Sequence, residues 1–505
     1  MRAVSIRTMR PDSPQADLSV ALASAPGAVA APPQGTTVLP RLAALRESLA
    51  LPRLRARATS RAGRLALSAM VLCTFAVVVF STARSSPLVP GSNLTFPRWE
   101  AGPLHLLTKH LAIGSQAANF AFSAVLLALI GAYAVALLAV RTMSMRALVL
   151  FVLLTHAILL LGPPLQLNDV FNYLGYARLG AIHHVNPYGH GIGTALHDPI
   201  FRFTSWHHLR SPYGPLFTAF SYPVARLPIP VAFWVLKVVP VLLSLAFLGL
   251  VHRCARLLGR DPRFAVLFVA ANPVFLMYEL AGFHNDFFML VPSMAAIALL
   301  LSRRDRSAGA MLMVAVAVKF TAVLLLPFLL LAARPVRRRL HLSLGAALAA
   351  IPLVALSLVL FGPHLPNLRD QSTLLTNWSI PNVVGVLIGA GGGAPWLLRV
   401  ANVAVVLTVA VLLRRRVQWL AGAGWATVAL MASLAWLVPW YVVWVLPLAA
   451  LATSVRLRKT ALAFTVFLVL TFMPGTSMFM HSLGVDLLGG AAGRASVGLQ
   501  DRLAR

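Results

Sequence analysis

Residues 264–301 read FAVLFVAANPVFLMYELAGFHNDFFMLVPSMAAIALLL, two apolar runs separated by the short polar element HND at residues 284–286. A helix that crosses the hydrocarbon core of a bilayer needs roughly 20 predominantly apolar residues. The two runs therefore predict membrane spans near residues 264–278 and 287–301, joined at a membrane boundary. Similar apolar runs recur along the chain, so the sequence predicts an all-α polytopic membrane protein.

The composition of the whole chain agrees with this class. Hydrophobic residues make up 59% of the 505 positions, charged residues make up 11%, and the mean hydropathy is +0.81. A soluble core of this size requires no such excess of apolar residues. From span length we expect about 13 transmembrane helices, two of them in a hairpin at residues 308–333. The other expected spans are residues 65–82, 116–140, 147–165, 230–251, 264–278, 287–301, 340–361, 397–413, 420–437, 442–452 and 462–473.

The charge of the chain follows the expected membrane topology. There are 43 Lys and Arg against 13 Asp and Glu, a formal net charge of +30 that in a soluble protein would suggest nucleic acid binding. Here the arginines lie in short clusters between apolar runs, where the positive-inside rule places cytoplasmic loops. The N-terminus should then be cytoplasmic, the C-terminus outside, and anionic lipid rather than nucleic acid the partner of these loops. The clusters lie at residues 53–64, 253–263, 303–306, 337–339, 414–416 and 456–459.

The ends of the chain differ from its middle. Residues 1–60 are rich in Ala, Pro, Ser and Arg and predict a disordered cytoplasmic tail, without the apolar stretch of a cleavable signal peptide. Residues 61–480 form one transmembrane domain without an internal repeat, and residues 481–505 are a C-terminal tail. Cys73 and Cys254 lie in or near predicted spans, so a structural disulfide is not expected.

Four polar loops fall on the outer side when the spans are counted from the cytoplasmic N-terminus. They hold most of the polar and aromatic residues that are not in arginine clusters. Loops on a rigid scaffold often carry function, so these four mark the functional face. The loops cover residues 166–215, 279–286, 362–382 and 439–441, and their acids are Asp169, Asp198, Glu279, Asp286 and Asp370.

The first outer loop begins QLNDVFNYLGYARLGAIHHVNPYG at residue 166. If the segment is helical, Asp169, Tyr173 and Tyr176 share one face at spacings of four and three residues. An ionisable side chain at the end of a span, facing protein, is a candidate functional group. The alternative is that Asp169 only caps the helix, because Asp is a favoured N-cap residue.

Aromatic side chains mark the predicted outer boundary at several places. Tyr188 and Tyr213 lie in the turn sequences HHVNPYG and SPYGP. Trp440, Tyr441 and Trp444 lie in LVPWYVVWVLPL, and sugar rings stack on such side chains. The alternative for all of them is an aromatic belt against lipid headgroups.

The HND element places His284, Asn285 and Asp286 at a membrane boundary. Burying such polar groups without partners costs about 2 to 7 kcal/mol each. We therefore expect them to pair with one another, with Asp169 or with a ligand; the alternative is a satisfied polar turn. A zinc site is disfavoured, because one His and scattered carboxylates lack its ligand count and spacing.

Lys319 interrupts the apolar sequence AVAVKFTAVLLLPF. Arginine clusters flank both ends of residues 308–333, which predicts a hairpin that returns to the cytoplasmic side. A Lys at membrane depth is costly and usually faces a cavity or an anion, for which a phosphate is the obvious candidate. The alternative is a side chain that extends along apolar surface to reach the interface.

In combination, these elements resemble the GT-C superfamily of membrane glycosyltransferases. The shared features are an outer Asp after an early span, NPY, SPYGP, GFHND, the lysine-interrupted hairpin and PWYVVW. Their order is most similar to the polyprenol-phosphomannose-dependent α-1,6-mannosyltransferases of actinobacterial lipoglycan assembly, over residues 65–473. Members of that group usually have a small residue ahead of HND, whereas this chain has Phe283.

The resemblance implies a GT-C-like catalytic domain that transfers a sugar, mannose in that group, from a polyprenyl-phosphate carrier to a glycan or lipoglycan. The site would lie on the outer face of the plasma membrane, with Asp169 as the catalytic base and no cofactor, although a divalent metal stays open. Phosphate would be held by cations, sugar hydroxyls by the HND element, and the acceptor by aromatic side chains. The implied substrate-binding residues are Tyr173, Arg178, Asn186, Tyr188, Arg210, Tyr213, His284, Asn285, Asp286, Lys319, Trp440 and Tyr441.

Two other classes of protein fit part of the pattern. A polytopic transporter or flippase of envelope precursors should show paired repeats with interrupted helices and polar residues near the midplane. A noncatalytic scaffold would explain the topology but not the outer acids. Transfer of a polyprenyl-linked sugar by membranes that contain the protein separates the enzyme from both.

Overall fold

The computed structural model describes residues 59–83, 86–89, 97–108, 110–111, 113–166, 169–366 and 368–504. The predicted tail at residues 1–60 lies outside the described residues, apart from its last two positions. Most of the described residues are helical, and the only β-type pairing among them is one isolated bridge between Gly191 and Arg210. The all-α fold class is therefore confirmed.

Five helices of the described chain are long and apolar enough to cross a membrane. A sixth span is possible if α22 (Val455–Phe472) and α23 (Pro474–Ser482), which meet at a bend of 59°, count as one. The expected number of about 13 spans is not confirmed, because many of the other apolar segments form shorter or interrupted helices. The five helices are α3 (Ser60–Ser81), α7 (Ser115–Ala139) with η1 (Val140–Thr142), α11 (Ile229–Leu257), α16 (Val336–Phe361) and α19 (Pro395–Arg414).

The surface of two of these helices indicates contact with lipid. α19 has no buried residue, and both α16 and α19 expose large aliphatic side chains, among them Val359 at 83% and Val406 at 68%. Soluble monomers rarely expose contiguous apolar surface of this extent. The protein is therefore a membrane protein, as its composition predicts.

Local sequence signals start several of the helices. The side chains of Thr59, Ser144 and Ser454 accept hydrogen bonds from the backbone N–H groups of the first turns of α3, α8 (Met145–Leu161) and α22. Asp261 does the same for α12 (Pro262–Ala270). These residue types are favoured N-caps because their oxygens satisfy N–H groups that have no partner within the helix.

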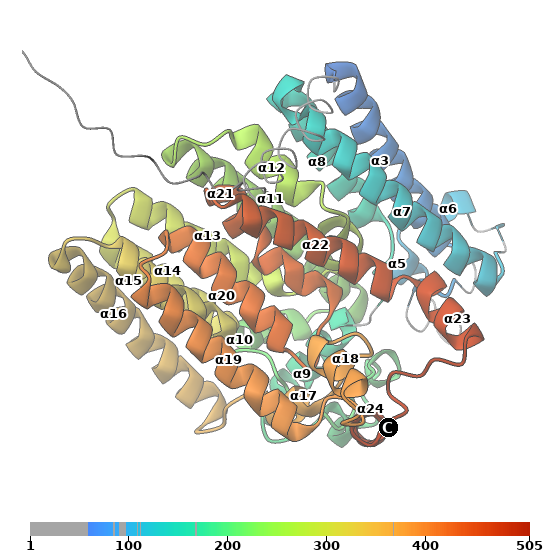
Figure 1. Cartoon of the computed structure of the whole chain (residues 1–505). Coiled ribbons are helices and arrows are strands. Elements are labelled where there is room, and N and C mark those ends of the chain that lie inside the picture. Colours follow the sequence, from blue (N-terminus) through green and yellow to red (C-terminus); the bar gives the residue numbers. More distant parts are fainter. Residues whose placement is uncertain are drawn as a thin grey trace, which may run out of the picture. The chain divides into compact units, whose positions relative to one another are not determined.

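The helices pack in two groups that Figure 1 shows at opposite edges of the described part. In one group α3 packs on both α7 and α8; in the other α14 (Asp305–Val318) packs on α13 (Asp286–Leu301) and α16. α14 and α16 approach closely because a glycine of each helix lies at their crossing. A Cβ atom added to Gly309 would lie 2.0 Å from Leu342 O, and one added to Gly345 would lie 1.9 Å from Arg306 O. Small residues allow such close approach of helices in membranes.

Two of the predicted inner loops meet at this crossing. Arg338 donates two hydrogen bonds to Asp305, at 2.6 and 2.8 Å, and a third to the carbonyl of Leu300 at 2.9 Å. The loops at residues 303–306 and 337–339 therefore lie at the same end of the helix bundle. This agrees with the expectation that both lie on one side of the membrane.

Irregular helical segments surround the centre of the described chain. A π-helical segment, η4 (Phe275–Leu280), precedes the HND element. Lys319 has an extended backbone between α14 and η5 (Phe320–Leu325), and η5 continues as α15 (Leu326–Ala332). The break expected within residues 308–333 thus falls at Lys319. Non-helical backbone at membrane depth is tolerated where it is buried in protein or lines a cavity.

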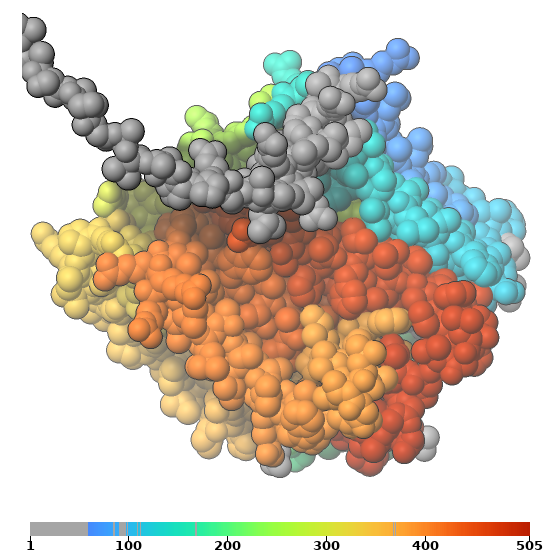
Figure 2. All heavy atoms as spheres, viewed as in Figure 1, coloured from blue at the N-terminus to red at the C-terminus, as the bar shows by residue number. Residues whose placement is uncertain are grey.

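The C-terminal segment predicted as a tail contains a helix, α24 (Ala491–Ala504), that packs against the loops predicted to lie on the outer side. Leu375 N donates to Ser496 Oγ at 2.7 Å, and His208 N donates to Leu503 O at 2.9 Å. Nearby, Asn382 on α18 (Ile380–Leu387) donates to the carbonyl of Leu487 at 3.0 Å. Figure 2 shows the light-orange atoms of α18 bordered by α19 and α20 and by the red C-terminal segment.

Candidate active site

A cavity of about 620 Å³ lies where the predicted outer loops meet. Its wall is formed by α9 (Asp169–Ala181), the loop at residues 205–214, η5, α17 (Leu368–Thr373), η6 (Pro439–Trp444) and α24. This volume is typical of a site for a small-molecule ligand. The polar side chains in the wall include Asp169, Lys319, Gln371, Ser372, Gln500 and Asp501.

Asp169 is the first residue of α9, and its side chain is 18% exposed toward the cavity. The Nδ1 atom of His284 approaches Asp169 Oδ2 to 3.1 Å, without the angles of a good hydrogen bond. The imidazole ring is held in place because its face stacks on Trp440, with the ring centroids 3.8 Å apart and the ring planes 11° apart. Of the partners that the sequence leaves open for the HND element, Asp169 is therefore one that it contacts.

The backbone ahead of His284 is bent into an unusual conformation. Phe283 has φ +50°, in the left-handed region that favours glycine, and its side chain is fully buried. The next turn is anchored by Asn285, whose N–H donates to Tyr173 Oη at 3.1 Å. The left-handed backbone gives a physical reason why a small residue would fit this position with less strain than Phe283.

Lys319 and Asp286 form an ion pair beside the cavity. Lys319 Nζ lies 2.7 Å from Asp286 Oδ1, and the indole N–H of Trp444 donates to the same oxygen. The ammonium also lies over the rings of Tyr441 and Trp444, 5.4 and 5.2 Å from their centroids. Of the described residues in the cavity wall, Lys319 is the only Lys or Arg. The expectation that it faces a cavity is therefore confirmed.

Tyrosines form the wall next to Asp169. Tyr173 and Tyr176 line the cavity together with Asp169, as their shared helix face predicts. Both rings contact Tyr213 edge to face, with centroids 4.9 and 5.9 Å apart. Tyr176 Oη donates to Leu209 O at 2.7 Å, which ties α9 to the loop that follows.

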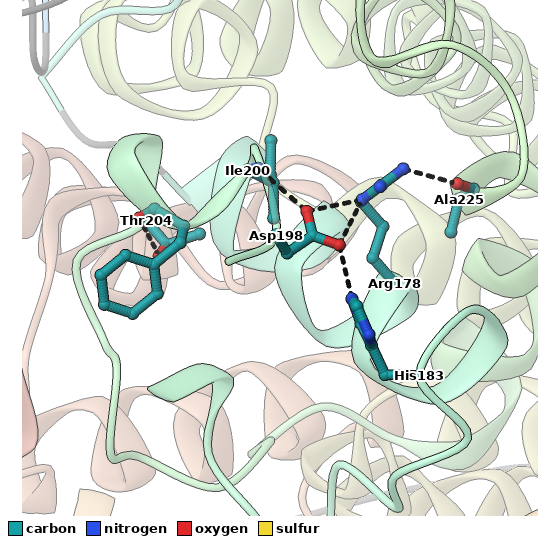
Figure 3. A network of polar contacts seen from close by, with 7 residues as sticks. Arg178, His183, Asp198, Ile200, Thr204 and Ala225 are labelled. Atoms are coloured by element: carbon teal, nitrogen blue, oxygen red, sulfur yellow. Dashed lines mark hydrogen bonds and ion pairs between the residues drawn. The ribbon is translucent and has the colours of Figure 1, made fainter. Parts of the chain in front are cut away.

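Arg178 lies outside the cavity wall and holds a loop in place (Figure 3). Its Nε donates to both oxygens of Asp198, at 2.9 and 3.1 Å, and its Nη1 donates to Ala225 O at 3.2 Å. His183 Nε2 lies 2.7 Å from Asp198 Oδ2, and Ile200 N–H donates to Oδ1 at 2.9 Å. Burial alone would raise the pKa of Asp198, but these donors, Arg178 above all, lower it below its usual value.

Five other predicted substrate-binding residues also lie outside the cavity wall. His284 and Asp286 are buried behind it, 3.1 Å from Asp169 and 2.7 Å from Lys319, respectively. The other three are Asn186, Tyr188 and Arg210. Asn186 donates to Phe361 O at 2.7 Å and accepts from Tyr188 N at 2.9 Å. Tyr188 Oη donates to Tyr213 O at 2.9 Å. Arg210, with its side chain 46% exposed, lies 3.7 Å from Asp370. Asn186, Tyr188 and Arg210 lie in the loop segments next to the cavity, and the structure does not bring them together with Asp169.

Sequence reasoning did not identify the far wall of the cavity. Trp206 and Trp436 meet edge to face with centroids 5.9 Å apart, and Gln500 Nε2 donates to Leu375 O at 3.2 Å. The hydropathy of α24 gives no signal that it covers a cavity. Trp206, however, lies in the polar loop at residues 166–215 that holds the other candidates, so its position is a usable signal.

Buried Lys237 was also missed. It lies within the apolar sequence VAFWVLKVVPVLL of α11, so the rule that identified Lys319 applied to it equally. Its Nζ donates to the carbonyls of Leu160 and Gly162, at 2.9 and 2.5 Å, and lies 4.9 Å from the centroid of Phe283. Lys237 therefore binds the last carbonyls of α8 and packs against Phe283 of the turn ahead of His284.

Among the described residues, no group of three or more His, Cys, Asp or Glu is arranged to hold a metal ion.

Comparison with known proteins identifies the chain. Residues 62–335 match the family model described as "Alpha-(1->6)-mannopyranosyltransferase, N-terminal domain", and residues 381–497 match "MptB C-terminal domain". The helical membrane fold and the match define a membrane glycosyltransferase. Because the first match alone covers more than half of the 505 residues, the chain belongs to the alpha-(1->6)-mannopyranosyltransferase family.

Two curated relatives carry the same name. Alpha-(1->6)-mannopyranosyltransferase A of Mycobacterium tuberculosis is 28% identical over 361 residues, which cover 64% of this chain and 69% of the relative. Alpha-(1->6)-mannopyranosyltransferase A of Corynebacterium glutamicum is 28% identical over 182 residues, 34% of this chain and 35% of the relative. No solved structure matches the chain.

Proposed function

We propose that the protein transfers mannose from a polyprenyl-phosphate carrier to a glycan or lipoglycan hydroxyl on the outer face of the plasma membrane. The observation that carries the proposal is the pair of opposite charges, Asp169 and Lys319, in the wall of one cavity of about 620 Å³. A hydroxyl nucleophile needs a base, and a phosphate leaving group needs a cation. The cavity supplies both, with Asp169 on the same helix face as Tyr173 and Tyr176 and with Lys319 as the cation.

Asp169 is the proposed catalytic base. The acceptor hydroxyl gives its proton to the carboxylate while its oxygen forms a bond to the anomeric carbon, and the bond from that carbon to the phosphate oxygen breaks. A single displacement of this kind inverts the anomeric centre. An α-linked product, as the family name states, then requires a β-linked donor. His284, held between Trp440 and Asp169, positions the base.

Lys319 is the proposed phosphate ligand. An ammonium has three N–H donors, and one is directed at Asp286, which leaves two for the phosphate oxygens. Asp286 and the two aromatic rings fix the side chain where negative charge develops on the leaving group. Because this cation belongs to the protein, the proposed reaction needs no cofactor, and treatment with EDTA should leave the rate unchanged.

The rest of the cavity wall suits a carbohydrate acceptor. Trp206, Trp436, Trp440 and Tyr441 offer apolar faces for sugar rings, and Gln371, Gln500 and Asp501 offer hydrogen bonds to hydroxyls. Aromatic faces with a few placed polar groups are typical of specific ligand sites. Asn186, Tyr188 and Arg178 then act through the loops that they support, and exposed Arg210 remains a proposed contact at the rim.

An apolar groove next to the cavity suits the carrier lipid. Thr321 and Trp444 line both the cavity and the groove, which continues between α13, η5, α20 (Trp419–Ser433) and α21 (Leu446–Leu451). Its lining is dominated by Met, Leu and Ile side chains. Its volume is only about 40 Å³, so it offers an apolar contact to the first part of an isoprenoid chain and no tunnel for the whole chain, whereas a nucleotide would gain nothing from this lining. The groove thus supports a polyprenyl-linked donor.

The proposal is tested with the full chain in lipid nanodiscs and two labelled donors, polyprenyl phosphomannose and a nucleotide-linked mannose. We expect the label to reach an oligomannoside acceptor only from the polyprenyl donor, in an α-1,6 linkage that a linkage-specific mannosidase removes. Transfer from the nucleotide sugar alone would overturn the donor class. Movement of the labelled lipid across vesicles without transfer would instead favour a flippase.

A further inference from the structure

Glu279 is a fully buried acid that the proposed reaction does not use. Its exposed fraction is 0%, and it lies in the π-helical segment η4, ahead of the HND element. Its backbone carbonyl accepts from the N–H of His284 at 3.3 Å, so the two segments are joined. Within the described chain, neither oxygen of its side chain has a hydrogen-bond partner. Because almost every buried polar group in a protein is paired, an unpaired buried acid needs an explanation.

The charged groups close enough to act on the Glu279 carboxyl group belong to the active site. They are Asp286, Lys319 and Asp169. Lys319 is the one cation among them, and its ammonium lies 2.7 Å from Asp286 Oδ1. Two other acids therefore share the field of this cation, and Glu279 has no cation of its own in the described part of the chain.

The elements that pack on η4 supply no counter-ion for Glu279. η4 packs against η6, α8, α11 and α12, which carry the titratable residues Tyr441, His156, Lys237 and Arg263, respectively. Lys237 binds two backbone carbonyls, and Arg263 forms an ion pair at the start of α12. Among the described residues, none of the four donates a hydrogen bond to the Glu279 carboxyl group.

The charge of this group matters because the proposed donor is an anion. If Asp169, Asp286 and Glu279 were all ionised, three negative charges would face the single positive charge of Lys319 where a phosphodiester has to bind. Like charges repel strongly in a medium of low dielectric constant. Asp169 has to be ionised to act as a base, and N–H groups of Lys319 and Trp444 stabilise the carboxylate of Asp286. Nothing in the described chain stabilises a charge on Glu279.

A proton on Glu279 removes this conflict. An ionised carboxyl group without a partner is far more costly to bury than a neutral one, so a group in this position binds a proton instead. Enzymes use carboxylic acids that an apolar site keeps neutral at pH 7.

We propose that Glu279 is a neutral carboxylic acid in the working enzyme, and that its proton keeps the negative charge of the site low enough for an anionic donor to bind beside Lys319. Glu279 does not line the cavity, so it is a positioning residue that acts through Lys319. The effect on the donor rests on the proposed function, whereas the protonation does not.

Infrared spectroscopy of the full chain in lipid nanodiscs tests the protonation. The carbonyl stretch of a protonated carboxyl group is separate from the bands of carboxylates. At pH 7, Glu279→Gln should remove one such carbonyl band from the spectrum of the parent protein. If the spectra of parent and variant agree in this region, Glu279 is ionised and the proposal is wrong.

The matched control is Glu100→Gln, which alters the other Glu of the described chain, 1% exposed. Burial raises the pKa of Glu100 to about 8, against a lowering by Lys237, so this group also holds a proton at pH 7. Its substitution should remove a different band, one that disappears from the parent spectrum as the pH rises past about 8. Removal of the same band by both substitutions would overturn the assignment. If Glu279→Gln does not fold, the parent itself decides, because one band should remain after the Glu100 band has disappeared.

Binding of polyprenyl phosphomannose in the absence of acceptor tests the effect on the donor. Because an amide copies a neutral acid, Glu279→Gln should keep Kd at pH 7 within about twofold of the parent value. Binding on the order of tenfold tighter would mean that Glu279 is ionised in the parent, and binding weaker by the same factor would mean that its charge is needed. Either result would overturn the proposal. If the parent binds no polyprenyl donor, the proposed function fails together with this effect, but an infrared band of Glu279 would still establish the protonation.

A fixed extra charge tests whether the charge of the site governs donor binding. Asn285 lines the cavity, and Asn285→Asp adds a carboxylate of the same shape. It should weaken donor binding on the order of tenfold more than the control Asn285→Ala, which removes the amide without adding charge. Equal weakening in the two variants would contradict a role for the Glu279 proton in donor binding.

Discussion

Lys319 Nζ lies 2.7 Å from Asp286 Oδ1, and the two side chains differ in exposure, 21% for the lysine and 1% for the aspartate. A buried carboxylate without a partner is strongly destabilising, and a lysine at membrane depth needs an anion or a cavity. Each side chain therefore offsets the cost of burying the charge of the other. The pair also directs the ammonium at the cavity, where it is the only described Lys or Arg.

We predict that Lys319→Ala abolishes use of the phosphate-linked donor for two separable reasons. The substitution removes the cation, and it leaves the buried carboxylate of Asp286 without a counter-ion. The double variant Lys319→Ala with Asp286→Asn removes the second reason, because an amide needs no counter-ion and its oxygen still accepts from Trp444. Thermal stability should recover in the double variant while activity stays low. Lys319→Arg should restore activity only in part, because the two cations differ in shape.

The measurement is the rate of transfer at saturating acceptor over a range of donor concentrations, together with the unfolding midpoint in detergent. If the double variant regains the rate of the parent protein, Lys319 serves only to neutralise Asp286. Full activity in Lys319→Ala itself would mean that the lysine has no role in the reaction.

A second prediction concerns α24, whose Asp501 lines the same cavity as the proposed base. Asp501→Asn should raise KM for the acceptor by about ten- to a hundredfold without changing KM for the donor, because a hydrogen bond to a charged group contributes about 1.5 to 3 kcal/mol. The matched control is Asp486→Asn, an exposed acid outside the cavity whose bond to Leu488 N an amide can keep. Equal effects of the two variants on KM would remove Asp501 from the acceptor site.

The sequence predicts those parts of the site that depend on local pattern. A helix starting at Asp169 and a break at Lys319 follow from the local pattern. The cost of burying polar groups requires a partner for His284, but the sequence leaves Asp169 as one of three candidates. Arg178 shows the limit. Its partner Asp198 is twenty residues away in an irregular loop, so no sequence periodicity indicates that this arginine forms an ion pair with a loop acid.

The count of membrane spans shows a different limit. Hydropathy identifies apolar segments but not whether each crosses the membrane in one helix. The π-helical η4 and the 3₁₀-helical η5 and η6 shorten segments whose composition alone predicts full spans. These interruptions depend on tertiary packing around the cavity, which a single sequence does not reveal.

The ion pair of Arg178 and Asp198 should contribute stability rather than catalysis. Because the folded-state pKa of Asp198 is lowered, the native state binds fewer protons than the unfolded state at acidic pH. Its contribution is therefore present above the unfolded pKa of about 3.9 and is lost as the pH falls below about 4. Asp198→Asn should lower the unfolding midpoint at pH 7 and flatten its dependence on pH between 5 and about 3.

Unfolding midpoints of the detergent-solubilised parent, Asp198→Asn and Asp486→Asn proteins check this prediction. The exposed Asp486 variant should follow the parent at every pH. A normal midpoint for Asp198→Asn combined with a large loss of transfer would instead return the Arg178 network to the substrate site.

The proposed topology makes a further prediction. A reporter fused after Arg339 should read cytoplasmic, and one placed between Tyr188 and Trp206 should read outside. The first follows from the arginine bias and from the contact of Arg338 with Asp305, which brings two arginine-rich loops to one end of the bundle. The same side for both reporters would contradict an active site on the outer face.

The most direct test of the account is the transfer rate of Asp169→Asn with polyprenyl phosphomannose. The substitution keeps the size of the side chain and its ability to cap a helix, so the protein should accumulate normally. It removes the group that takes the proton of the acceptor hydroxyl, a contribution of about a hundred- to ten-thousandfold. We predict that kcat falls by that factor while KM for the donor changes little. A rate close to that of the parent protein would show that Asp169 only begins its helix, and the proposed mechanism would be wrong.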